Sequence, residues 1–193
     1  NELVDNGGAM RCPFEITVLG RGQANLDICG ERIPLTKGKY TRWVAVEFKA
    51  GPGMKIKGIC EFLLIETEPE FDLYVTPIQI HPDKPAMPIS HPSVYSSYLS
   101  KRQGLYATLG LAEDTWGLNA KILDDEGFLH QCLENDSERE RMFFDALDKM
   151  SRGLCVCVFD GTDRIQHMFW RYIDPEHPAH AGLPNAFCED RCS

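Results

Sequence analysis

Apolar and polar residues alternate along several stretches of the first 80 residues, and this period of two predicts β-strands. The alternation is found at residues 14–18, 44–48, 56–64 and 71–75. Breaks such as Gly20-Arg21-Gly22 and Gly51-Pro52-Gly53 carry turn-forming residues. Short strands joined by such turns favour an antiparallel, β-sandwich-like unit, which we assign to residues 1–80.

A proline-rich segment at residues 81–92 follows the strands. Proline disfavours helix interiors and central strands, so we interpret this segment as a linker. Beyond it, Ser90 is a candidate cap for a short helix that has Pro92 in its first turn and ends before Gly104.

The hydrophobic pattern then changes to a helical period. A long helix is predicted to begin at Asp124 and to stop at Gly153. Its apolar stripe consists of Leu129, Cys132, Leu133, Phe143, Leu147 and Met150. Residues 134–140 within this helix are all polar, so the pattern does not decide whether the helix is continuous through them. Residues 154–159 are apolar at both odd and even positions, which is typical of a strand that is buried on both faces in a parallel α/β sheet.

These patterns predict an α+β chain in which residues 93–193 form a partial α/β segment. Twenty Lys and Arg residues face 29 Asp and Glu residues, which gives a formal charge of −9. Such an acidic chain is a poor binder of nucleic-acid duplexes. No apolar run reaches the roughly 20 residues of a spanning helix, so we expect no membrane partner.

The eight cysteines are expected to be free thiols in a reducing, cytoplasmic compartment. Their density is below that of disulfide scaffolds, and several lie within apolar runs.

The most informative stretch is residues 159–170, where Asp163 and His167 are four positions apart. On a helix these side chains share one face, and a carboxylate with an imidazole can hold one zinc ion. The spacing alone also suits a helix N-terminus in which Asp160 or Asp163 caps backbone amides and His167 has no special role.

Residues 153–170, together with residues 106–116 and 88–92, resemble the type I phosphodiesterase/nucleotide pyrophosphatase family of the alkaline phosphatase superfamily. In that family a buried strand leads to a D-x-x-x-H motif whose Asp and His bind one of two zinc ions. Asp163 and His167 match these positions. The resemblance covers about residues 85–178, and residues 1–80 look like an insertion that some members carry.

This resemblance implies hydrolysis of a small phosphate ester or nucleotide by two divalent metal ions, with a Thr or Ser nucleophile. The family's nucleophile and remaining ligands have no counterpart here, so we expect an internal fragment that is inactive in isolation. In this reading Asp160 orients the loop before the motif. A partial sheet would also expose apolar surface and predict self-association.

Three weaker signals remain. Glu113, Asp114, Trp116 and Asn119 are candidates for lining a substrate pocket, or alternatively a helix cap with a packing tryptophan. His177, His180, Cys188 and Cys192 have the residue types of a structural zinc site. Basic residues of the β-rich unit either attract phosphate-rich substrates or form a solvated face. The alternative function class is a non-catalytic β-sandwich binding or interaction module.

Overall fold

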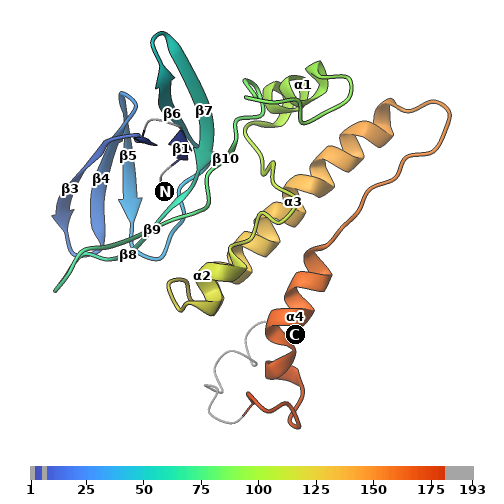
Figure 1. Ribbon diagram of the computed structural model, residues 1–193. Helices are drawn as coiled ribbons and strands as arrows, with labels where there is room; N and C mark the ends of the chain where they lie inside the picture. Colours follow the sequence, from blue (N-terminus) through green and yellow to red (C-terminus); the bar gives the residue numbers. More distant parts are fainter. Residues whose placement is uncertain (1–2, 6–7, 181–193) are drawn as a thin grey trace. The chain divides into compact units, whose positions relative to one another are not determined.

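The structure is a computed structural model that describes residues 3–5 and 8–180 of the chain (Figure 1). It is a mixed α+β fold with antiparallel sheets, as the sequence predicts. The chain divides into two compact units, residues 1–128 and 129–193, and each is described separately below.

Ten β-strands belong to the first unit. They are β1 (Leu3–Asp5), β2 (Gly8–Met10), β3 (Phe14–Gly20), β4 (Gln23–Ile28), β5 (Glu31–Thr36), β6 (Val44–Gly51), β7 (Met54–Cys60), β8 (Phe62–Glu66), β9 (Asp72–Val75) and β10 (Gln79–Ile80).

These strands form two three-stranded sheets, in the orders β3-β4-β5 and β10-β7-β6, and two hairpins, β1-β2 and β8-β9. All of these pairings are antiparallel. The predicted alternation at residues 56–64 is divided at Glu61 into β7 and β8. The strands β4, β5 and β10 were not among the predicted stretches. The residues of β4 do alternate between polar and apolar side chains, so this strand could have been predicted, whereas β5 contains Pro34 and β10 has only two residues.

Side chains from both three-stranded sheets and from β8 share one core. Its fully buried members come from alternate positions of each strand, as a period of two requires: Ala24, Leu26, Ile28, Leu35, Val44, Val46, Phe48, Cys60, Phe62 and Leu64. By contrast, β3 is an edge strand of its sheet, and Phe14 and Val18 remain 45% and 47% exposed. The strand was therefore predicted correctly, and Ile16 is its partly buried side chain that packs against the core.

Residues 81–128 contain two helices, α1 (Val94–Gln103) and α2 (Thr115–Asn119). The predicted short helix is confirmed and ends before Gly104, whose φ of 92° and amide hydrogen bond to the Ser100 carbonyl close the last turn. Its N-cap is Ser93 rather than Ser90, although the Ser90 hydroxyl accepts a 3.0 Å hydrogen bond from the Ser96 amide.

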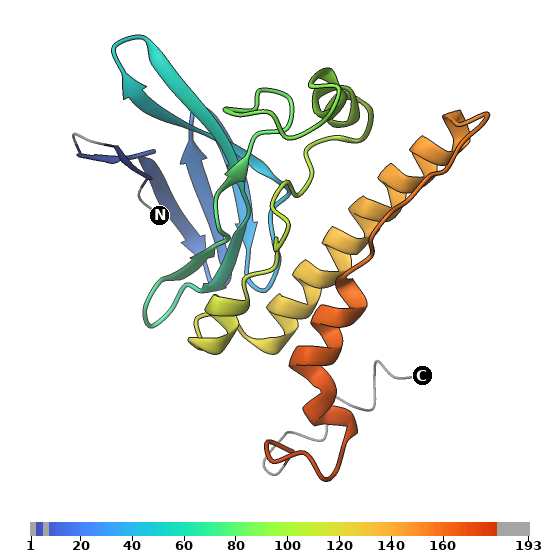
Figure 2. The same cartoon turned by 45° about the vertical axis from the view of Figure 1, so that its right-hand side comes forward.

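The long helix α3 (Asp125–Lys149) is continuous through the polar stretch at residues 134–140. It begins one residue after the predicted start, and Asp124 Oδ1 accepts a 2.7 Å hydrogen bond from the Gly127 amide. The chain then runs back along α3 to α4 (Gly161–Ile173), as both ribbon views show (Figure 2).

The prediction of a buried strand at residues 154–159 is wrong. This segment is extended but pairs with no described strand, and Leu154, Val156 and Val158 are 73–85% exposed. Its one ring contact is edge-to-face between Phe159 and Phe143 of α3, with centroids 5.9 Å apart. A strand forms only where another backbone accepts its hydrogen bonds, and the described residues supply none here.

Candidate functional site

The predicted Asp-His pair lies on α4, which begins one residue after Asp160. Because Asp163 and His167 are four residues apart, the helix places them on one face. Asp163 Oδ1 and His167 Nε2 are 3.3 Å apart, and both side chains are largely exposed, at 60% and 74%. Neither side chain is needed for packing, so both are available to a ligand from solvent.

The separation of these two atoms fits two ligands of a single zinc ion. Zinc bonds to carboxylate oxygen and imidazole nitrogen are about 2.0–2.2 Å long, so a tetrahedral angle puts such ligands roughly 3.3–3.5 Å apart. The observed 3.3 Å lies within that range. A charge-assisted hydrogen bond between an imidazolium and a carboxylate is shorter, at about 2.7–2.9 Å, so the two atoms are farther apart than in such a bond.

Further metal ligands are not assembled in the described part of the chain. Among the described residues, no group of three or more His, Cys, Asp or Glu side chains is placed to hold a metal ion. His177 and His180 follow α4, and His180 Nδ1 lies 2.9 Å from the Arg171 carbonyl oxygen. The other two members of the predicted tail site, Cys188 and Cys192, lie outside the described residues.

Asp160 anchors the start of α4 to α3. Its Oδ1 accepts a hydrogen bond from the Arg139 guanidinium, and its backbone carbonyl accepts one from the Arg164 amide at 3.1 Å. The next residue, Gly161, allows close approach, because a Cβ there would lie 3.0 Å from Cγ of Asp136. These contacts hold the first turn of α4 against α3, although the Asp160 side chain makes no cap of the helix.

The four candidate pocket residues serve different purposes. Asp114 caps α2 by accepting a 2.8 Å hydrogen bond from the Gly117 amide, and Glu113 beside it is buried. Trp116 is 73% exposed and Asn119 is also exposed. The alternative interpretation of these residues was a helix cap with a packing tryptophan. The cap is observed at Asp114, but the Trp116 side chain is exposed and is not packed in the core. The four candidates are close together in the sequence, but the Asp114 side chain is already hydrogen-bonded within the fold.

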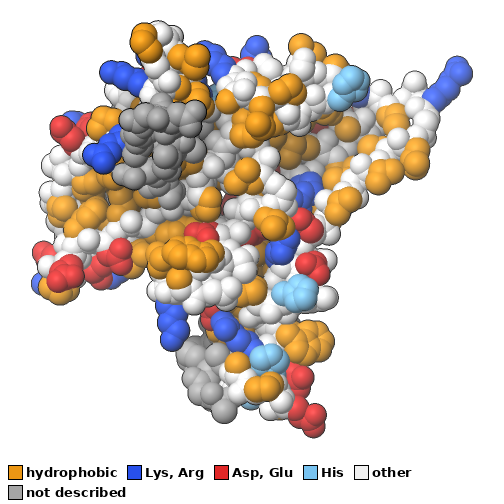
Figure 3. Space-filling model, in the orientation of Figure 1, with side chains coloured by type: hydrophobic (Ala, Val, Ile, Leu, Met, Phe, Trp, Pro, Cys, Tyr) orange, Lys and Arg blue, Asp and Glu red, His pale blue; other side chains and the backbone are white. Residues whose placement is uncertain are grey.

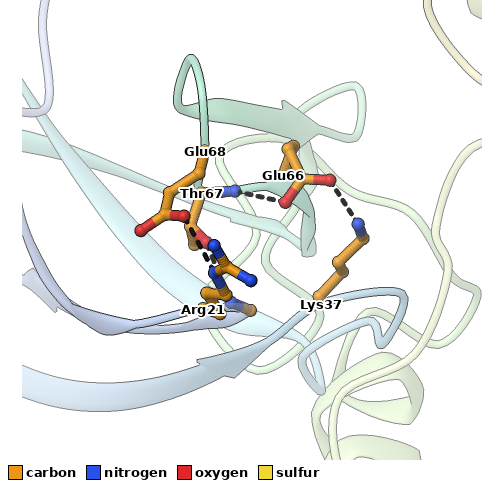
Figure 4. A network of polar contacts seen from close by, with 6 residues as sticks. Arg21, Lys37, Glu66, Thr67 and Glu68 are labelled. Carbon is orange, nitrogen blue, oxygen red and sulfur yellow. Dashed lines mark hydrogen bonds and ion pairs between the residues drawn. The ribbon is translucent and has the colours of Figure 1, made fainter.

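The β-rich unit carries an open groove that the sequence reasoning missed. It has a volume of about 880 Å³ and lies between the β3–β4 turn, β5 and the end of β8. Figure 4 shows the side chains that border it. Arg21 Nε donates a 3.1 Å hydrogen bond to Glu68, Lys37 pairs with Glu66, and the Thr67 hydroxyl accepts from the Gly22 amide at 2.8 Å.

The same pairing occurs elsewhere among the basic residues of this unit. Lys55 and Lys57 both approach Glu47, at 2.6 and 3.8 Å. The partners in these ion pairs come from different strands or from the loops next to them, and they are up to 47 positions apart, so no local sequence signal identifies them. Arg21 and Lys37, the two cations that border the groove, are therefore each paired with a carboxylate.

Comparison with protein-family models, with curated proteins and with solved structures found no match to this chain. The resemblance to the phosphodiesterase family therefore rests on the motifs themselves. Each described helix is either too short or too polar to cross a lipid bilayer.

Proposed function

We propose that this chain is a segment of a metal-dependent phosphate-ester hydrolase of the phosphodiesterase/nucleotide pyrophosphatase type. In it, Asp163 and His167 hold one divalent ion, for which zinc fits the donor atoms best. The observation that carries the proposal is the 3.3 Å separation of Asp163 Oδ1 and His167 Nε2 on an exposed helix face. The matching sequence around them supports it.

A metal pair in such enzymes neutralises the charge that develops on the phosphoryl oxygens and activates the attacking oxygen. The contribution of this chain is positional. Arg139 and Asp160 fix the first turn of α4, and the helix then sets the spacing of the two ligands. In this proposal the second metal ion, the nucleophile and the remaining ligands come from residues other than those described.

Isothermal titration of zinc into the reduced chain tests the metal site. We expect weak binding that is lost in the Asp163→Ala/His167→Ala variant, because two ligands alone give an incomplete coordination shell. The matched control is Asp174→Ala/His177→Ala, which removes the same two residue types just beyond the helix. Loss of binding only in the control would assign the zinc to the tail and contradict the proposal.

Activity provides a second test. The chain by itself is expected to leave a nitrophenyl phosphodiester unhydrolysed in zinc, since it holds only two of the ligands. Zinc-dependent hydrolysis by the pure chain, abolished by Asp163→Ala, would contradict the fragment interpretation while supporting the metal site.

The second candidate function is a non-catalytic interaction module, in which residues 1–80 form a sandwich-like insert. The open groove bordered by Arg21, Lys37, Glu66 and Glu68 favours it. A small phosphate ester such as a nucleoside monophosphate would have to compete with Glu66 and Glu68 for the two cations. Binding that persists in a metal chelator and is lost in Arg21→Ala/Lys37→Ala would favour the module. Binding that requires zinc and Asp163 would favour the hydrolase.

A further proposal concerns self-association. Hydrophobic side chains gather at the surface of the unit that holds α3 and α4 (Figure 3). The exposed apolar residues there are Leu133, Phe144, Leu147, Leu154, Val156, Val158, Trp170 and Ile173. Exposed apolar surface of this extent is typical of a surface that another polypeptide covers. In the hydrolase proposal other parts of the parent enzyme cover it, and in the isolated chain a second copy does.

A further inference from the structure

Two cysteines that lie 17 positions apart in the sequence meet at one end of the β3-β4-β5 sheet. Cys12 Sγ and Cys29 Sγ are 3.5 Å apart, which is van der Waals contact between unbonded sulfur atoms. A disulfide requires about 2.05 Å, so the two atoms must approach by roughly 1.5 Å. Cys29 is exposed, so its side chain has room to rotate toward Cys12.

The backbone brings the two residues together by strand pairing. Phe14 of β3 is opposite Ile28 of β4, so the residues just before β3 lie beside the turn after β4. Cys29 and Gly30 form that turn, with φ values of 51° and 85°. Positive φ at both central positions is the type I′ geometry, which normally carries Asn-Gly. A cysteine is therefore held in a position where asparagine would be favoured.

The two thiols differ in their accessibility. Cys29 is exposed, whereas Cys12 is partly buried against the core. Burial raises the pKa of the Cys12 thiol. Cys60, the nearest core cysteine in the same unit, is 2% exposed, and burial raises its pKa to about 12. Cys60 is therefore shielded from solvent, whereas the exposed Cys29 is the thiol that a disulfide in solution reaches first, and Cys12 beside it is placed to react second.

The pair opens onto a second groove of about 450 Å³, which Glu31, Glu47 and Lys57 also line. This groove thus combines a dithiol with a cation and carboxylates. Glutathione-type peptides carry both carboxylates and an ammonium group. Glu31 is a partner for the ammonium group. Lys57, which lies 3.8 Å from Glu47 and shares that carboxylate with Lys55, is a partner for a peptide carboxylate.

We propose that Cys12 and Cys29 are a thiol–disulfide exchange site for small peptide disulfides of the oxidised glutathione class. The Cys29 thiolate attacks one sulfur of the peptide disulfide, its S–S bond breaks, and one peptide thiolate leaves. The Cys12 thiolate then attacks Cys29 Sγ, the mixed disulfide breaks, and the second peptide thiolate leaves. The two protons released by the cysteines neutralise the two peptide thiolates. The chain is oxidised by two electrons and the peptide disulfide is reduced.

Peptide mapping of the full chain tests this proposal. The reduced protein is incubated with oxidised glutathione, remaining thiols are alkylated, and the chain is cleaved with trypsin. Cleavage after Arg11, Arg21 and Arg32 separates Cys12 and Cys29 into peptides 12–21 and 22–32. We expect the linked pair of these two peptides to form about tenfold more readily in the folded chain than in urea, because folding raises the effective concentration of the thiols.

Single variants separate the two steps. In Cys12→Ser, Cys29 is expected to remain as the mixed disulfide with glutathione. In Cys29→Asn, which suits the turn and so preserves the fold, Cys12 is expected to remain unmodified. Absence of the linked peptides, or equal formation in folded and urea-unfolded chains, would overturn the proposal. So would modification of Cys12 in Cys29→Asn at the wild-type rate. The test involves no zinc and is independent of the hydrolase proposal.

Discussion

The Tyr74 hydroxyl donates a 2.8 Å hydrogen bond to Oδ2 of Asp114 and so links β9 to the beginning of α2. The other carboxylate oxygen, Oδ1, accepts from the Gly117 amide, also at 2.8 Å. The Asp114 carboxylate therefore accepts hydrogen bonds from two groups at once: a backbone amide in the first turn of α2, which has no partner within the helix, and the tyrosine hydroxyl. Gly117 is needed for this arrangement, because a Cβ there would lie 2.5 Å from Asp114 Oδ2.

The Asp114→Ala variant is expected to lower the free energy of unfolding by about 2–3 kcal/mol, since it removes a helix cap and a charged hydrogen bond. Tyr74→Phe removes only the second contact and is expected to cost about 1–2 kcal/mol. Urea unfolding measures both. Trp116→Ala is the control, because that side chain is exposed and its change should stay within about 0.5 kcal/mol. Equal stability of Asp114→Ala and the wild type would show that the cap contributes nothing.

Gly58 marks a place where two strands approach too closely for a side chain. It pairs with Ile80 of β10, and a Cβ at this position would lie 2.6 Å from Ile78 Cγ2 and 3.0 Å from the Gln79 carbonyl oxygen. Gly58→Ala is therefore expected to cost about 1–3 kcal/mol and to loosen β10. Hydrogen exchange of the Ile80 and Gly58 amides reports the loosening.

Gly51→Ala at the end of β6 is the matched control for Gly58, because open space surrounds that position. It should leave both stability and exchange near the wild-type values. A similar loss in the two variants would mean that chain flexibility, rather than steric overlap, is the cause.

His81 is expected to make the protein sensitive to mild acid. Its Nδ1 accepts hydrogen bonds from the backbone amides of Asp83 and Lys84, at 3.2 and 3.3 Å, which requires a neutral ring. Burial, followed by the charge of Lys57, lowers the pKa of His81 below its usual 6.5. The unfolded chain thus binds this proton first, so stability is fully present above about pH 6.5 and declines as the pH falls below it.

Unfolding midpoints in urea between pH 7.5 and 5 measure this effect. In His81→Asn, an amide oxygen replaces Nδ1 as the acceptor and cannot titrate, so the decline below pH 6.5 should shrink. His130→Asn, at an exposed position, should retain the wild-type slope. If His81→Asn also retained that slope, other groups would be responsible for it.

Self-association can be measured by sedimentation velocity over a range of concentrations. Replacing two exposed valines in Val156→Ser/Val158→Ser should weaken association by about tenfold or more, since burial of each valine contributes on the order of 1.5 kcal/mol. Both side chains are solvent-exposed, so the fold should tolerate the change. Met54→Ser, at an exposed position in β7, is the control. A wild-type chain that stays monomeric at high concentration would contradict the proposal.

Much of the secondary structure was predictable because it depends on local periodicity. The alternation at residues 44–48 and 71–75 matches β6 and β9, and the helical stripe after Asp124 matches α3. The relation between Asp163 and His167 is equally local, since any helix through this stretch brings residues four apart onto one face. For that reason the candidate metal pair could be proposed before any tertiary structure was considered.

The sequence by itself therefore determined several of the antiparallel strands, the long helix and the spacing of the Asp-His pair, all of which follow from periods of two and 3.6 residues. Only the tertiary structure decided that residues 154–159 remain unpaired among the described strands, that Asp114 is committed to Tyr74, and that Cys12 meets Cys29. These relations join residues up to 40 positions apart. They depend on which strands and helices pack together, and the period of a short segment carries no information about its distant partner.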